Sequence, residues 1–156
     1  MKFPLAFLLT WTTYGTWLHG DERGSFNAYG NFIPATSILR AKAVAAMSED
    51  AVILTDEQRK IVDARLLELC CLAGWCLHAR NVRTNHVHAV VSASLAGEAL
   101  RSRLKAGCSM SLSEHAGLVI AGKNGARKWW TQKGNIVEIW SERHLEEEIK
   151  YVNEGQ

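Results

Sequence analysis

Residues 75–92 read WCLHARNVRTNHVHAVVS and give the strongest indication of the fold. Two runs of strand length, 75–82 and 86–92, carry most of the apolar residues, and the polar turn 83–85 separates them. This pattern predicts a β-hairpin. Because successive side chains of a strand alternate between its faces, we expect the two histidines of the second strand to point the same way.

The flanking sequence contains start and stop signals for the remaining elements. Before the hairpin we expect a buried strand (5–13), a long loop (14–50) that carries a short helix (37–47), and a helix that begins at the Thr55 capping box and ends at Gly74. After the hairpin we expect a helix capped by Ser94 and a glycine-containing loop (113–126). A second hairpin, with strands 128–132 and 136–139 on either side of Lys133-Gly134, and a last helix from the Ser141 cap through Val152 complete the order. The first part of this order approaches the split β-α-β pattern of ferredoxin-like proteins. We therefore predict an α+β fold with an antiparallel sheet.

Length and composition limit the remaining possibilities. The chain has 156 residues, 47% of them apolar, which suits one domain over residues 1–156. No apolar run approaches the roughly 18 residues of a membrane span, and the first residues read as a strand rather than a signal peptide. Four cysteines without a CxxC motif favour reduced thiols in a cytoplasmic protein. The net charge of +2 is too small to indicate a nucleic-acid partner by itself.

His86 and His88 are the first candidate site. Two imidazoles on one strand face can hold one divalent ion, and the alternative is an ordinary pair of surface or hydrogen-bonded histidines. Histidine-triad nucleotide hydrolases use a third alternating histidine as the nucleophile. That position is Val90 here, which argues against this class.

Tyr151 is the second candidate. The apolar stripe of the last helix is Leu145, Ile149 and Val152, and Tyr151 lies roughly 100° away from it. One interpretation is an amphipathic tyrosine at the rim of the core. The other is a nucleophile: phenols are mostly protonated at neutral pH, but a divalent ion at a phosphate can make one competent.

A histidine pair on a strand and a tyrosine on a terminal helix, in this order, resemble the single-tyrosine HUH transposases. Residues 9–25 (LTWTTYGTWLHGDERGS) look like the first strand and loop of the branch related to REP-associated tyrosine transposases. Residues 128–131 (KWWT) and 149–156 (IKYVNEGQ) look like its closing hairpin and helix. The resemblance covers nearly the whole chain, and it implies a ferredoxin-like fold whose C-terminal helix carries the tyrosine.

The resemblance also implies an activity. Tyr151 would attack a phosphate of single-stranded DNA, often beside an imperfect hairpin, leave a 5′-phosphotyrosine and release a 3′-OH, and strand transfer would reverse this attack. His86 and His88 would bind Mg²⁺ or Mn²⁺. The family commonly has an amide or carboxylate ligand one turn after the tyrosine, where this chain has Gly155. We expect Gln156 to serve instead, with Glu148 as the alternative.

Basic and aromatic residues are the expected DNA contacts. For Arg101 and Lys105 a solvated helix face is an equal alternative, and at least one of the tryptophans 129 and 130 is expected in the core. An alternative to the enzyme is a single-stranded-DNA-binding protein of this fold without chemistry, and the choice between monomer and homodimer stays open. The expected contacts are Arg80 and Arg83 beside the histidine hairpin, Arg101 and Lys105 on the following helix, Arg127, Lys128 and Trp130, and His19 and Arg23 in the glycine-rich loop.

Overall fold

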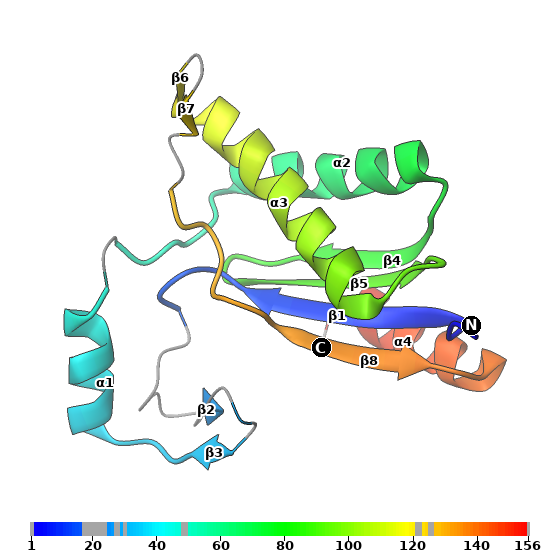
Figure 1. The fold of residues 1–156 in the computed structure, drawn as a ribbon, viewed down its shortest axis with the longest axis horizontal. Helices are drawn as coiled ribbons and strands as arrows, with labels where there is room; N and C mark the ends of the chain where they lie inside the picture. The colour runs from blue at the N-terminus through cyan, green and yellow to red at the C-terminus, as the bar shows by residue number, and fades with distance from the viewer. Residues whose placement is uncertain are drawn as a thin grey trace.

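A computed structural model describes residues 2–16, 25–26, 29, 31–47, 50–120, 123–124 and 127–155 (Figure 1). In none of these ranges does a helix combine the length and apolar character that a membrane crossing requires. The elements in chain order are β1 (Ala6–Thr12), β2 (Ser25–Phe26), β3 (Phe32–Ile33), α1 (Ser37–Ala45), α2 (Asp56–Ala73), β4 (Cys76–Val82), β5 (His86–Ser92), α3 (Gly97–His115), β6 (Val119–Ile120), β7 (Lys123–Asn124), β8 (Asn135–Ile139) and α4 (Glu142–Asn153).

Four strands form the main sheet, in the order β4-β5-β1-β8, and every neighbouring pair is antiparallel. The units β1-α2-β4 and β5-α3-β8 each skip one strand position, which is the split β-α-β arrangement of ferredoxin-like proteins. Helices α2 and α3 cover one face of the sheet, and α4 covers the other (Figure 1). The predicted α+β fold and its C-terminal helix are confirmed.

Strand β5 is central, and from Ala89 to Val91 it is apolar on both faces. Val87, Ala89 and Val91 are buried in the core beneath α2 and α3, and Val90 is buried in the smaller core beneath α4. Removing such side chains from water contributes about 1.5–3 kcal/mol for each large aliphatic residue. The two polar side chains at the start of β5, His86 and His88, lie on the α4 face with Val90.

The predicted signals at the helix ends are largely confirmed. Thr55 and Gln58 form the reciprocal capping box of α2, and Gly74 ends the helix with φ 71°. Ser141 Oγ accepts from the main-chain N–H of His144 at the start of α4. The prediction for Ser94 is wrong, because α3 begins after Ala96 with no side-chain cap.

Two predicted segments differ from the structure. Helix α3 continues to His115, and β6 and β7 form a short ladder where a loop over 113–126 was expected. Lys133-Gly134 is not a hairpin turn. Residues 135–139 pair with β1, and Trp130 bridges Thr13, so the segments on both sides of the glycine follow the same neighbouring strand. Between the pairs Thr10–Asn135 and Thr13–Trp130, four residues oppose two, as in a bulge.

We predict that Gly134→Ala destabilises the fold by about 1–3 kcal/mol. Gly134 has φ 137°, and a Cβ there would overlap the main-chain oxygen of Thr10. Urea unfolding followed by circular dichroism measures the loss. Gly117→Ala is the matched control, because Gly117 also has positive φ but has open space around it. Equal losses in both variants would contradict the role of the close approach to β1.

Candidate active site

The two histidines lie side by side on β5. Their ring centroids are 4.8 Å apart and their planes are nearly perpendicular. His88 is 7% exposed, and His86 is partly buried. In the sheet register, His88 lies between Asn81 of β4 and Thr10 of β1, and His86 lies opposite Thr12.

Hydrogen bonds orient both rings through Nδ1. His86 Nδ1 lies 2.7 Å from Asn85 Oδ1, an amide oxygen that can accept a proton donated by Nδ1. His88 Nδ1 lies 2.9 Å from Thr10 Oγ1. In both rings Nδ1 makes the hydrogen bond, so Nε2 is the nitrogen suited to bind a metal. Metal-bound histidines usually have such a hydrogen bond on their other ring nitrogen. The donor chemistry therefore fits a divalent ion.

Helix α4 brings Tyr151 to this pair. The predicted apolar stripe is confirmed, since Leu145 and Val152 are buried and Ile149 packs against the same core. Tyr151 lies at the rim of that core, 46% exposed, and its ring centroid is 5.9 Å from that of His88. The residues singled out as candidate nucleophile and candidate metal ligands thus come together from two distant elements.

The end of α4 is fixed to β4 and the turn after it. Asn81 Nδ2 donates to the carbonyl of Val152 at 3.2 Å, and the Arg83 guanidinium donates to the carbonyl of Gly155 at 2.9 Å. Arg83 lies beside His86, because its main-chain N–H donates to the carbonyl of His86 at 2.8 Å, and a phosphate contact by Arg83 stays a prediction. Arg80 is different: its guanidinium makes two hydrogen bonds, 2.7 Å and 3.2 Å, with Asp63 of α2, on the opposite face of the sheet. The expectation that Arg80 lies near the histidine pair is wrong.

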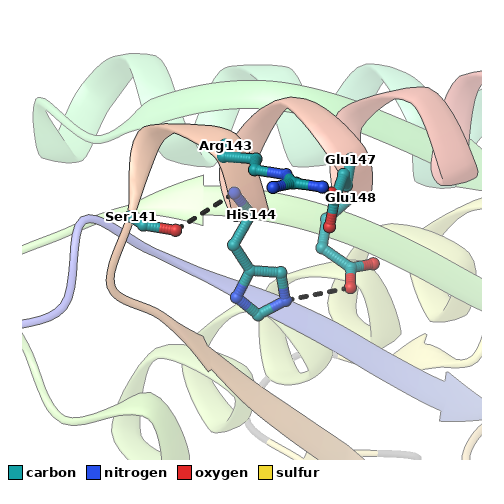
Figure 2. A network of polar contacts seen from close by, with 5 residues as sticks. All are labelled: Ser141, Arg143, His144, Glu147 and Glu148. Atoms are coloured by element: carbon teal, nitrogen blue, oxygen red, sulfur yellow. Dashed lines mark hydrogen bonds and ion pairs between the residues drawn. The ribbon is translucent and has the colours of Figure 1, made fainter.

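Two polar pairs of side chains lie along α4 (Figure 2). His144 Nε2 lies 3.1 Å from Glu148 Oε1, and Arg143 pairs with Glu147. No three His, Cys, Asp or Glu side chains cluster as metal ligands within the described ranges. Glu148 pairs with His144 in this structure, and its suggested use as third ligand stays a prediction. Gln156, the other candidate, lies outside the described residues, as do His19 and Arg23.

Three expected DNA contacts have structural partners instead. The main-chain carbonyls of the bulge before β8 accept hydrogen bonds from side chains of α3. Arg101 donates to Gly134 O at 3.0 Å, and Lys105 Nζ donates to Thr131 O and Lys133 O at 2.7 and 2.6 Å. Trp130 is 9% exposed and donates to Lys105 O. Base stacking on Trp130 is thus contradicted, and Trp129, at 4% exposed, is core as well.

Arg127 and Lys128 directly precede Trp129 and Trp130, whose main chain pairs with Tyr14 and Thr13 after β1. The Arg127 guanidinium lies 5.3 Å from the centroid of the Trp129 ring and donates to Asp50 O at 3.3 Å. Lys128 Nζ lies 5.7 Å from the centroid of the Tyr14 ring. A DNA contact by either residue stays a prediction.

The partly buried position of the Lys105 amine can be tested through the pH dependence of the free energy of unfolding. Burial, with a smaller contribution from the charge of Arg101, lowers the pKa of Lys105 to about 8. In the unfolded chain a lysine titrates near 10.4, so between about pH 8 and 10.4 the unfolded state binds more protons and stability rises with pH. We predict that wild type gains unfolding free energy over Lys105→Met between pH 7 and pH 10, measured by urea unfolding. A difference in unfolding free energy between the two proteins that does not change with pH would contradict the buried amine.

Sequence reasoning missed three residues of the site. Thr10, Asn81 and Asn85 orient the histidines or the tyrosine helix. Asn85 could have been found from its position directly before His86. Thr10 and Asn81 could not, because their role depends on the register of β1 and β4 against β5.

No protein-family model and no curated protein matches the chain. Solved structures do match, among them the following two. A candidate transposase from Deinococcus radiodurans R1 is 15% identical, and the match covers 99% of this chain and 92% of that protein with a TM-score of 0.53. A REP-associated tyrosine transposase bound to a REP hairpin is 9% identical, and the match covers 97% of this chain and 68% of that protein, also with a TM-score of 0.53. The chain therefore shares its fold with both proteins over nearly its whole length.

Proposed function

We propose that this chain is a tyrosine transposase that cleaves and rejoins single-stranded DNA. The observation that carries the proposal is the convergence of Tyr151, His88 and His86 on the α4 face of the sheet, with the tyrosine ring 5.9 Å from that of His88. The fold shared with a tyrosine transposase supports the same reaction class.

In the proposed reaction, the Tyr151 hydroxyl oxygen attacks a backbone phosphorus, and the bond from phosphorus to the 3′-oxygen breaks. The phenol proton passes to solvent, and the leaving oxygen takes a proton to become a 3′-OH. The DNA on the 3′ side of the break stays joined to Tyr151 through its 5′-phosphate. The energy of the broken diester is conserved in this bond, so a 3′-OH can reverse the attack and join strands.

The histidine pair is proposed to hold Mg²⁺ or Mn²⁺. Its Nδ1 hydrogen bonds to Asn85 and Thr10 orient Nε2 of each ring for a ligand. A bound divalent ion would act as a Lewis acid that draws charge from the scissile phosphate. Gln156 is the proposed third ligand, because Gly155 supplies no side chain.

A single strand beside a hairpin is the proposed DNA substrate, because the REP-associated neighbour is bound to a REP hairpin. Tyr151 is nearly half exposed, so a strand can reach it from solvent. The cationic side chains of Arg127 and Lys128 are proposed to contact phosphates away from the histidine pair.

The test is incubation of the full chain with hairpin-bearing single-stranded DNA and Mn²⁺ or Mg²⁺, followed by denaturing electrophoresis. A 3′-end label is expected to move with the protein, whereas a 5′-end label is expected on a shortened free fragment with a 3′-OH. EDTA and fully duplex DNA serve as controls. DNA binding with no adduct under either metal would instead identify a single-stranded-DNA-binding protein of the same fold.

A further inference from the structure

Asn81 and Arg83 are next to the histidine pair across the hairpin. Asn81 is the register partner of His88 in β4, and the main-chain N–H of Arg83 donates to the carbonyl of His86 at 2.8 Å. The same two side chains make the contacts to the end of α4. Asn81 and Arg83, which hold the tyrosine helix, are therefore the cross-strand neighbours of the candidate metal ligands His88 and His86.

A β-bulge puts both side chains on the correct face. The register of β4 against β5 shifts between Leu77 and Ala79. Leu77 packs in the core beneath α2 and α3, whereas Ala79 packs beneath α4. The alternation that follows sends Asn81 toward α4 and Arg80 toward α2.

The last carbonyls of a helix have no partner inside the helix. At the C-terminal end of α4, side chains from outside the helix donate to two main-chain carbonyls. The Asn81 amide donates to Val152 O at 3.2 Å, and the Arg83 guanidinium donates to Gly155 O, just beyond the helix, at 2.9 Å. Tyr151 directly precedes the first of these acceptors and lies one turn before the second. Both contacts therefore fix the turn that carries the tyrosine.

Gly155 allows this arrangement. It has φ 68°, and a Cβ at this position would lie 3.1 Å from an Arg83 guanidinium nitrogen and 3.5 Å from the Asn81 amide nitrogen. A side chain at residue 155 would thus extend into the space that the two donors occupy. Here the chain presents a main-chain carbonyl to Arg83 and no side chain to the site.

We propose that Asn81 and Arg83 are positioning residues that hold the last turn of α4, and with it the Tyr151 hydroxyl, at the histidine pair of the same chain. The catalytic consequence rests on the proposed function, whereas the attachment of the helix does not. This role differs from a phosphate contact by Arg83, which would act on DNA affinity rather than on the tyrosine.

The kinetic test separates the two roles of Arg83. In Arg83→Ala and Asn81→Asp, we expect the rate constant of adduct formation at saturating DNA to fall about tenfold or more, with Kd within about twofold of wild type. Arg83→Lys, which keeps a donor, is expected to recover part of the rate. The salt dependence of Kd is expected to stay unchanged in Arg83→Ala. A slope reduced by about 0.7, the loss of one single-strand phosphate contact, with an unchanged rate constant would overturn the proposal.

Amide hydrogen exchange without DNA tests the attachment itself. We expect faster exchange at residues 150–154 in Asn81→Asp and Arg83→Ala, with exchange in α2 unchanged. Arg143→Ala is the matched control, because its side chain is 90% exposed and also lies on α4. Unchanged exchange in both variants would overturn the proposal whatever the DNA assay gives. If exchange is faster in the two variants but the wild-type chain itself forms no adduct, the attachment of the helix is supported and the transposase activity is rejected.

Discussion

Tyr151→Phe is expected to eliminate the covalent adduct. The substitution removes only the phenolic oxygen that attacks phosphorus, and loss of a catalytic nucleophile typically reduces rates by about 10³-fold or more. The ring that packs 5.9 Å from His88 is retained, so the fold and the Kd for hairpin-bearing DNA are expected to stay close to wild type. Denaturing electrophoresis with a 3′-labelled strand measures the adduct, and fluorescence anisotropy measures Kd.

Tyr29→Phe is the matched control for this experiment. Tyr29 is 89% exposed and loses the same atom. It is expected to form the adduct at the wild-type rate. Mass spectrometry of the wild-type adduct after proteolysis is expected to place the nucleotide on the peptide containing Tyr151. An adduct that persists in Tyr151→Phe would show that another residue is the nucleophile.

The histidine pair, the hairpin and the stripe of α4 could be predicted from the sequence because each depends on local periodicity. Strand alternation over seven residues places His86 and His88 together, and helical spacing places Tyr151 off the apolar stripe. The meeting of tyrosine and histidines requires α4 to cover the opposite face of the sheet from α2 and α3. No local pattern indicates this placement, and the family resemblance implied only that the C-terminal helix carries the tyrosine.

Long-range pairing explains what the sequence could not show. Lys133-Gly134 suits a hairpin turn and a bulge equally well, and the choice depends on β1, more than 120 residues away along the chain. Arg101 and Lys105 read as a solvated or DNA-binding face because the carbonyls of the bulge are invisible in the sequence. Arg80 and Arg83 look equivalent beside the hairpin, yet their partners lie on opposite faces of the sheet.

The double variant His86→Ala/His88→Ala is expected to lose cleavage while DNA binding persists. Removing both imidazoles removes the proposed metal ligands, and Mn²⁺ binding measured by electron paramagnetic resonance is expected to disappear with the activity. His88 is buried against Thr10, so a thermal melt must show that the variant folds. His78→Ala, at the opposite end of the hairpin, where its Nε2 lies 2.7 Å from Ser92 Oγ, is the matched control and is expected to retain Mn²⁺ binding. Loss of DNA binding equal to the loss of cleavage would show that the pair is structural or contacts DNA.

Mixing the two inactive proteins extends this prediction to the geometry of the site. Tyr151→Phe retains the histidines, and the double histidine variant retains the tyrosine. If α4 is held by Asn81 and Arg83 of its own chain, neither protein can supply its intact half to the other, and the mixture is expected to form no adduct at any ratio. Recovery of adduct on mixing, with the DNA joined to the histidine-deficient chain, would show that the tyrosine of one chain reaches the histidines of another. It would also place the helix of the reactive species away from the contacts that Asn81 and Arg83 make here.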